Sequence, residues 1–207
     1  MQNTTIKGAT MISAVLISIQ PKWVEKIANG EKTIEVRKTK PKLETPFKVY
    51  IYATWNGSKK EILVKQDGLL YCEDWRKANG LQRASGKVIG EFVCDRIDSY
   101  VGRDDNKDYW DLSVEEWEEL KKKSCLTIPQ ILEYTGDCCR CYGWHISDLK
   151  IYDKPKELRE FTPICRLRKD LCKVCCFYEE AFGGCCRTLT RPPQSWCYVE
   201  DLESVPR

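Results

Sequence analysis

Residues 16–37 read LISIQPKWVEKIANGEKTIEVR, and their pattern predicts a strand, a short helix and a second strand in succession. The apolar run Ala14–Ile19 is typical of a buried strand. Because proline suits the first turn of a helix, Pro21–Ala28 is predicted to be helical and to end where Gly30 permits a left-handed turn. Thr33–Arg37 alternates charged and β-branched side chains, which favours a strand.

The second of these strands has a charged face. Side chains alternate along a strand, so Glu35 and Arg37 should lie opposite Ile34 and Val36, with Lys32 at the preceding turn. An ammonium, a carboxylate and a guanidinium would then meet at one end of a sheet. Such a group can hold a phosphate, polarise a carbonyl or accept from an exocyclic amine. The alternative is a solvated strand face with an internal ion pair.

The rest of the chain mixes strands and helices without the regular alternation of a parallel sheet. Strands are expected at Lys48–Ala53, in a hairpin that turns at Asp67-Gly68, at Lys87–Val101 and at Trp144–Tyr152. Capping patterns begin two helices at Ser113 and Thr127. The predicted fold class is α+β: a mostly antiparallel sheet, either open or closed, with short helices beside it.

Length and composition fit one main domain with an appendage. The chain has 207 residues, of which 42% are hydrophobic and 31% charged, so it can bury a core. We expect a flexible leader at 1–12, a domain at 13–161 and a cysteine-rich tail at 165–207. Since no apolar run approaches the length of a membrane span, a cytoplasmic protein with no membrane partner is predicted.

Charge is unevenly distributed along the chain. Residues 1–100 hold 17 basic and 11 acidic residues, a balance of +6, whereas residues 101–120 hold 2 basic and 8 acidic residues, a balance of −6. A basic first half suits a polyanionic partner such as RNA. An ordinary solvated surface is the alternative.

Thirteen cysteines suggest a metal site in the tail. Seven of them lie in the last 43 residues, and dense cysteine without a secretory signal favours metal over disulfides. The predicted cofactor is a structural zinc ion held by Cys172, Cys175, Cys185 and Cys197, with Cys176 and Cys186 as alternates. Disulfides and unligated thiols remain open. A second, weaker cluster comprises Cys125, Cys138, Cys139 and Cys141.

The spacing G-x-K-x-x-E-x-R of Gly30, Lys32, Glu35 and Arg37 resembles the signature of the ASCH domain family, part of the PUA-like group. The blocks VYIYAT, GKVIGEFVCDRI and YGWHISDLKIYDKPKELREF also resemble ASCH proteins of bacteria and their phages, as does the ending TRPPQSWCYVEDL. The resemblance implies a β-barrel with a cleft beside the signature, where RNA or a modified nucleobase is received. Lys32, Glu35 and Arg37 are the signature positions.

Position in the chain adds further candidates around this cleft. Ser18, Gln20 and Trp23 should wall it at the junction of the first strand and helix, and Tyr50 or Tyr52 could offer a stacking face. Plain packing is the alternative for the aromatic residues. Attraction for the phosphate backbone would come from Lys38, Lys40 and Lys42.

The same resemblance raises a hydrolase alternative. One ASCH subgroup removes the acetyl group of acetylated cytidine with a lysine, a threonine three residues later and a distal glutamate. Here Lys32 is the candidate catalytic residue, but Glu35 stands at the threonine position, and the distal glutamate would be Glu91 or Glu73. The lone histidine, His145, and Cys94 are interpreted as structural.

The sequence therefore predicts an ASCH domain that binds RNA or a modified nucleobase or nucleotide. A hydrolase that uses Lys32 on nucleosides or RNA is the first alternative. The second is a protein–protein adaptor that acts through the acidic segment Asp104–Glu119.

Overall fold

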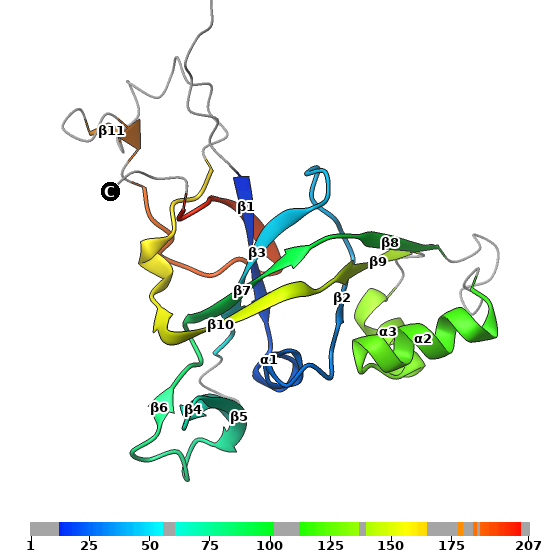
Figure 1. Ribbon diagram of the computed structural model, residues 1–207, viewed down its shortest axis with the longest axis horizontal. Coiled ribbons are helices and arrows are strands. Elements are labelled where there is room, and N and C mark those ends of the chain that lie inside the picture. The colour runs from blue at the N-terminus through cyan, green and yellow to red at the C-terminus, as the bar shows by residue number, and fades with distance from the viewer. Residues whose placement is uncertain are drawn as a thin grey trace, which may run out of the picture.

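A computed structural model describes residues 13–55, 61–101, 112–136, 140–164, 178–179, 184–185 and 187–203 (Figure 1). Its helices are α1 (Pro21–Ala28), α2 (Val114–Ser124), α3 (Ile128–Thr135) and the 3₁₀ helix η1 (Leu158–Glu160). Its strands are β1 (Ser13–Ile19), β2 (Ile34–Arg37), β3 (Phe47–Ala53), β4 (Glu61–Gln66), β5 (Leu69–Asp74), β6 (Gln82–Arg83), β7 (Val88–Cys94), β8 (Ile97–Val101), β9 (Arg140–His145), β10 (Ser147–Lys156), β11 (Tyr178–Glu179), β12 (Gly184–Cys185) and β13 (Trp196–Glu200). The expected leader at 1–12 lies outside the described residues.

The central layer is a five-stranded sheet with the order β10-β7-β3-β1-β13. Strands β1 and β3 are parallel, and the other neighbours in this sheet are antiparallel. Helix α1 provides the crossover that a parallel pair requires, because it follows β1 directly. The sheet is therefore mixed, although most of its pairings are antiparallel as predicted.

Two long antiparallel segments continue from this sheet into a second one with the order β2-β9-β8. The predicted strand at Lys87–Val101 is interrupted after Cys94 and resumes at Ile97, and the segment opposite is interrupted at Ile146. Figure 1 shows β8 and β9 extending beyond β7 and β10 toward α2 and α3. The described residues do not show a closed barrel: their strands form separate sheets, and both long segments break at these points.

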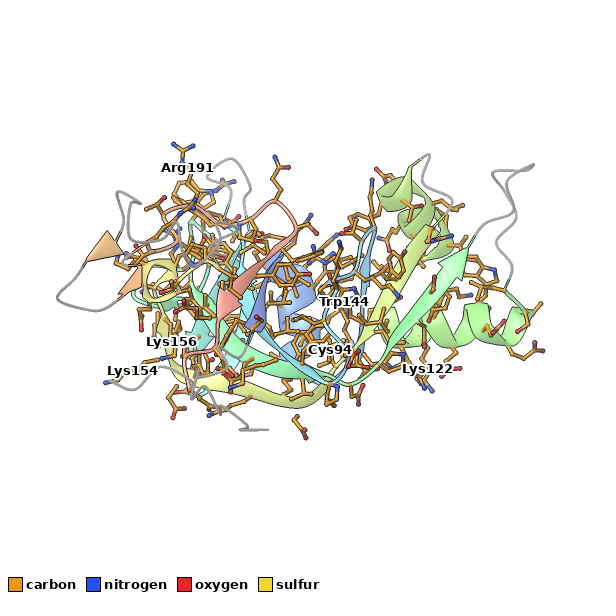
Figure 2. All side chains as sticks on the ribbon, turned by 90° about the horizontal axis from the view of Figure 1, so that it is seen from above. Cys94, Lys122, Trp144, Lys154, Lys156 and Arg191 are labelled. Atoms are coloured by element: carbon orange, nitrogen blue, oxygen red, sulfur yellow. The ribbon has the colours of Figure 1, made fainter. Side chains whose placement is uncertain are left out.

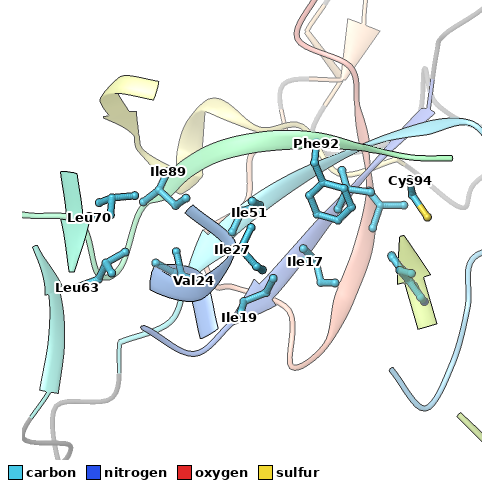
Figure 3. Packing of buried hydrophobic residues seen from close by; sticks show 14 of the residues in the cluster. Ile17, Ile19, Val24, Ile27, Ile51, Leu63, Leu70, Ile89, Phe92 and Cys94 are labelled. Carbon is cyan, nitrogen blue, oxygen red and sulfur yellow. The ribbon is translucent and has the colours of Figure 1, made fainter. Parts of the chain in front are cut away.

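The main core lies between the five-stranded sheet and α1. Val24 and Ile27 of α1 are fully buried and pack with Ile17 and Ile51 of the sheet (Figure 3). The hairpin β4–β5 packs against the same helix and contributes Leu63. Its predicted turn is confirmed, since Asp67 and Gly68 both have positive φ angles.

Helices α2 and α3 cover the outer face of β2. Ile34 and Val36 pack there with Leu120 and Ile131, one from each helix. The predicted capping box at Ser113 is present, and the predicted N-cap Thr127 also forms one, because each accepts a hydrogen bond from the third residue of its helix. Since the opposite face of β2 is also buried, the strand has no solvated side.

Residues 187–203 join the central sheet through β13. Strand β13 pairs with β1 along Ser13↔Glu200 to Ile17↔Trp196. Val199 is fully buried there, and Ile164 donates its backbone N–H to Tyr198. No helix within the described ranges is long and apolar enough to cross a membrane.

Candidate functional site

The three signature side chains meet at the inner face of β2, as predicted. Lys32 Nζ lies 3.2 Å from Glu35 Oε2, and Arg37 Nη2 lies 3.0 Å from Glu35 Oε1. The three side chains are 1%, 8% and 7% exposed, so this is a buried network and not a solvated strand face. One carboxylate therefore bridges two desolvated cations, which leaves a net charge of +1 for the group.

Backbone oxygens hold Lys32 in place. Its ammonium donates to the carbonyls of Ile34 (2.9 Å) and Ser124 (2.7 Å) in addition to Glu35. Burial lowers the pKa of Lys32, and the Glu35 carboxylate opposes that shift. Because three acceptors surround the three N–H donors, the geometry fits an ammonium ion and ties β2 to the end of α2.

Arg37 connects the network to β1 and to the C-terminal segment. Its Nη2 donates to the Ser18 carbonyl (2.7 Å), and Nη1 donates to Ser195 Oγ (3.3 Å). Its Nε is buried and finds no hydrogen-bond partner among the described residues. Ser18 in turn donates through Oγ to Pro193 and through its backbone N–H to Ser195. The segment before β13 is thus fastened directly to the signature arginine.

A cavity of about 680 Å³ lies over this network. The predicted wall residues Ser18, Gln20 and Trp23 line it together with Lys32, Glu35 and Arg37. Its remaining lining residues are Ile19, Lys22, Val36, Thr54, Leu126, Gln130, Glu133, Tyr134 and Gln194. Several of these, from α3 and the C-terminal segment, were missed by sequence reasoning. The spacing of the lining residues along α3 does not indicate that this helix packs beside β2.

A family model for the ASCH domain matches residues 17–163. The chain belongs to the ASCH domain family. The signature Gly30, Lys32, Glu35 and Arg37, on which the resemblance was first noted, lies within the matched range. A comparison with curated proteins found no match.

Solved structures support the same fold for this ASCH domain. A tyrosine-to-phenylalanine variant of ZmASCH from Zymomonas mobilis superposes with a TM-score of 0.50 at 16% identity, covering 92% of each chain. A serine-to-alanine variant of the same protein gives a TM-score of 0.50 at 16% identity, covering 94% of this chain and 92% of that one. At this identity, the likeness concerns the fold alone.

Tyr50 and Tyr52 do not line the cavity, which corrects their expected stacking role. They alternate along β3 with Val49 and Ile51, whose side chains pack in the core beneath α1, so the tyrosines project from the other face of the sheet. There Tyr50 packs edge-on against Phe161.

A polar network on that second face anchors the C-terminus. The Tyr50 hydroxyl donates to Asp201 Oδ1 at 2.6 Å, and burial raises the pKa of Tyr50. Burial also acts to raise the pKa of Asp201. However, hydrogen bonds from Tyr50, from the Glu203 N–H and from Lys48 outweigh burial and hold the Asp201 pKa below 3.8.

Lysines and aromatic rings pair around the cavity. Lys22 Nζ lies 4.5 Å from the centroid of the Trp23 ring, and Lys38 Nζ lies 5.5 Å from that of Tyr134. Lys40 is placed similarly over Tyr142, outside the cavity lining. The predicted backbone-phosphate lysines are all exposed, and they comprise Lys38, Lys40 and Lys42.

Of the residues of the hydrolase alternative, Lys32 lines this cavity, but the candidate distal glutamates do not. Neither Glu91 nor Glu73 lines it, and the Tyr152 hydroxyl donates to Glu91. His145 Nε2 lies 2.6 Å from Asp98 Oδ2, away from the cavity lining. Cys94 is a buried thiol, as interpreted, and burial raises its pKa to about 12.

The described residues include only part of the predicted zinc site. The side chains of Cys172, Cys175, Cys176, Cys185 and Cys186 lie outside the described residues. Cys197 packs on β13 beside the cluster of Leu16 and Val199, and burial raises its pKa to about 11. No group of three potential ligands occurs in the described part of the chain.

The second cysteine cluster is also only partly described. Cys141 is fully buried among the side chains under α2 and α3, whereas Cys125 ends α2 and its thiol contacts the Glu31 carbonyl. Cys138 and Cys139 fall outside the described residues.

Proposed function

We propose that this ASCH domain binds single-stranded RNA and inserts one nucleobase, unmodified or modified, into the cavity over Lys32, Glu35 and Arg37. The observation that carries this proposal is the buried charged network at the floor of a 680 Å³ cavity with aromatic walls. Ligand cavities of roughly 300–1,000 Å³ are typical of small-molecule sites, so the volume suits a nucleoside.

The floor favours a ligand rich in acceptor oxygens. Two cations and one carboxylate are desolvated there, and fixed charges act more strongly where water is excluded. A base carbonyl or a phosphate oxygen gains from the excess positive charge. Glu35 supplies an acceptor beside the cations, so a base that also carries an exocyclic amine is matched on both sides.

The walls suit the flat face and the polar edge of a base. Trp23 presents an indole ring that is already flanked by the Lys22 ammonium, and Tyr134 faces the cavity from α3. Unpaired RNA bases are commonly stacked on such rings and hydrogen-bonded along their edges. Gln20 and Gln194 bring amide groups that can read such an edge.

The exposed lysines near the cavity suit the RNA backbone. Lys22 and Lys38 lie beside aromatic residues of its lining, and Lys40 follows in the same loop. Phosphate contacts of this kind position a strand without reading its sequence, and they make affinity depend on salt.

A titration with a short random-sequence single-stranded RNA at fixed salt tests the proposal. Trp23→Leu keeps apolar packing but removes the stacking face, so affinity should fall roughly 5- to 150-fold. Lys154→Ala removes an exposed lysine at the outer edge of the molecule (Figure 2) and should change affinity little. Circular dichroism checks that both variants fold. Equal affinity of wild type and Trp23→Leu would refute binding in the cavity.

The same samples decide the hydrolase alternative. Lys32 donates to three acceptors, which favours a charged, fixed group over a general base. Incubation with acetylated cytidine and with labelled RNA should therefore give no product. Turnover that disappears in Lys32→Met would replace the binding proposal by the hydrolase. The adaptor alternative depends on residues 104–119, of which 104–111 lie outside the described residues.

A further inference from the structure

An exposed tryptophan lies directly beside the cavity wall. Thr54 lines the cavity, and Trp55 follows it at the end of β3. The Trp55 side chain is 51% exposed, which is unusual for a residue with so much apolar surface. Isolated exposed apolar residues need no explanation, but this one is ordered by specific contacts.

Arg83 holds the indole ring. The guanidinium carbon of Arg83 lies 3.7 Å from the centroid of the Trp55 ring, and Arg83 Nε donates to the Ser85 carbonyl. The backbone fixes this pair, since Ala53 accepts from the Gly86 N–H and donates to the Lys87 carbonyl. The stacked pair is therefore positioned by the sheet before any ligand arrives.

The Arg83 guanidinium has no carboxylate partner within the described residues, and it contacts the Trp55 ring and the Ser85 carbonyl. A different arrangement holds at Trp75, which is 57% exposed: the neighbouring Arg76 forms an ion pair with Asp74 at 3.5 Å. The Trp55 surface thus combines an exposed ring with an uncompensated positive charge, whereas the charge beside Trp75 is compensated.

We propose that Trp55 and Arg83 form a second nucleotide subsite, which binds the nucleotide next to the base held in the cavity. This inference rests on the proposed function. The base stacks on the indole, and the phosphate pairs with the guanidinium. Stacking of this kind tolerates any base, because every base has a π face. An acidic peptide is less well suited, since it would use the charge but not the ring.

Two matched pairs of variants test the subsite with the short random-sequence single-stranded RNA. Trp55→Ala should weaken binding roughly 5- to 150-fold, the range for loss of one stacked base. Trp75→Ala removes an equally exposed indole and should leave affinity within about twofold, because surface contacts outside the site contribute little. Arg83→Gln should reduce the salt dependence of binding, and Arg76→Gln should not.

Crosslinking locates the RNA independently of affinity. Irradiation of the complex with 4-thiouridine-substituted RNA should place crosslinks on the peptide that contains Trp55. Loss of affinity in Trp23→Leu with wild-type affinity in Trp55→Ala would overturn the subsite and leave the cavity intact. Absence of RNA binding by the wild-type chain would overturn the proposed function and the subsite together.

Discussion

Glu35→Gln gives the sharpest test of the buried charged network. Glutamine keeps the size of the side chain and part of its hydrogen bonding, but it removes the negative charge that pairs with both Lys32 and Arg37. At an effective dielectric constant near 20, unit charges about 3 Å apart attract each other by roughly 5 kcal/mol. Part of each attraction is offset, because an uncharged amide costs less to bury than a carboxylate.

The net loss in the free energy of unfolding depends on the charges that remain buried. Breaking a buried pair by removing one partner typically costs about 3–5 kcal/mol, because the remaining charge has no compensation. For a chain of this size, each 1 kcal/mol corresponds to about 2–4 °C in Tm, so Glu35→Gln should lower Tm by roughly 6–20 °C. Thermal unfolding followed by circular dichroism measures this difference.

Glu119→Gln is the control for the loss of a carboxylate. Glu119 pairs with Lys123 on the exposed face of α2, where water screens the charges, so its Tm should stay close to that of the wild type. Equal melting temperatures for wild type and Glu35→Gln would refute the reasoning, because they would show that Lys32 and Arg37 need no buried counter-charge.

Two further predictions concern the C-terminal part of the chain. The pKa of Asp201 is lowered in the folded state, so its stabilising effect is present above the ordinary value of 3.8 and is lost as pH falls through the lowered one. Asp201→Asn should therefore lower Tm at neutral pH, and the difference from wild type should shrink below about pH 4; a difference that is constant with pH would contradict the role of the Tyr50 hydrogen bond. Elemental mass spectrometry of the purified chain should find zinc that is lost in Cys172→Ser and Cys175→Ser but retained in Cys94→Ser, whose thiol is buried in the main core. Zinc-free wild-type protein would reject the metal site.

Local sequence was sufficient for most individual elements. Helix α1 runs over Pro21–Ala28 as predicted, and the Asp67-Gly68 turn and both capping boxes are present. These features depend on residues within a few positions of each other, whose preferences act before the chain is folded. The meeting of Lys32, Glu35 and Arg37 is local in the same sense, because alternation along one short strand aligns them.

The alternation of side chains along a strand does not predict which face of that strand lines a cavity. Strand β3 is buried on both faces, so the pattern of Tyr50 and Tyr52 was compatible with the cavity or with the opposite side. Helix α1 packs on the face that carries Val49 and Ile51, so the tyrosines lie on the opposite face, where Tyr50 bonds Asp201. When a strand is buried on both faces, its sequence does not indicate which set of alternating side chains faces a cavity.

Local patterns specified most of the individual elements, the family signature and the charged group at the floor of the cavity. They did not specify that Gln194 and Tyr134 complete the walls or that β13 joins β1. These contacts depend on the folded chain because they join segments far apart in the sequence. Their pairing is chosen by the burial of the whole core and leaves no periodic pattern in either segment.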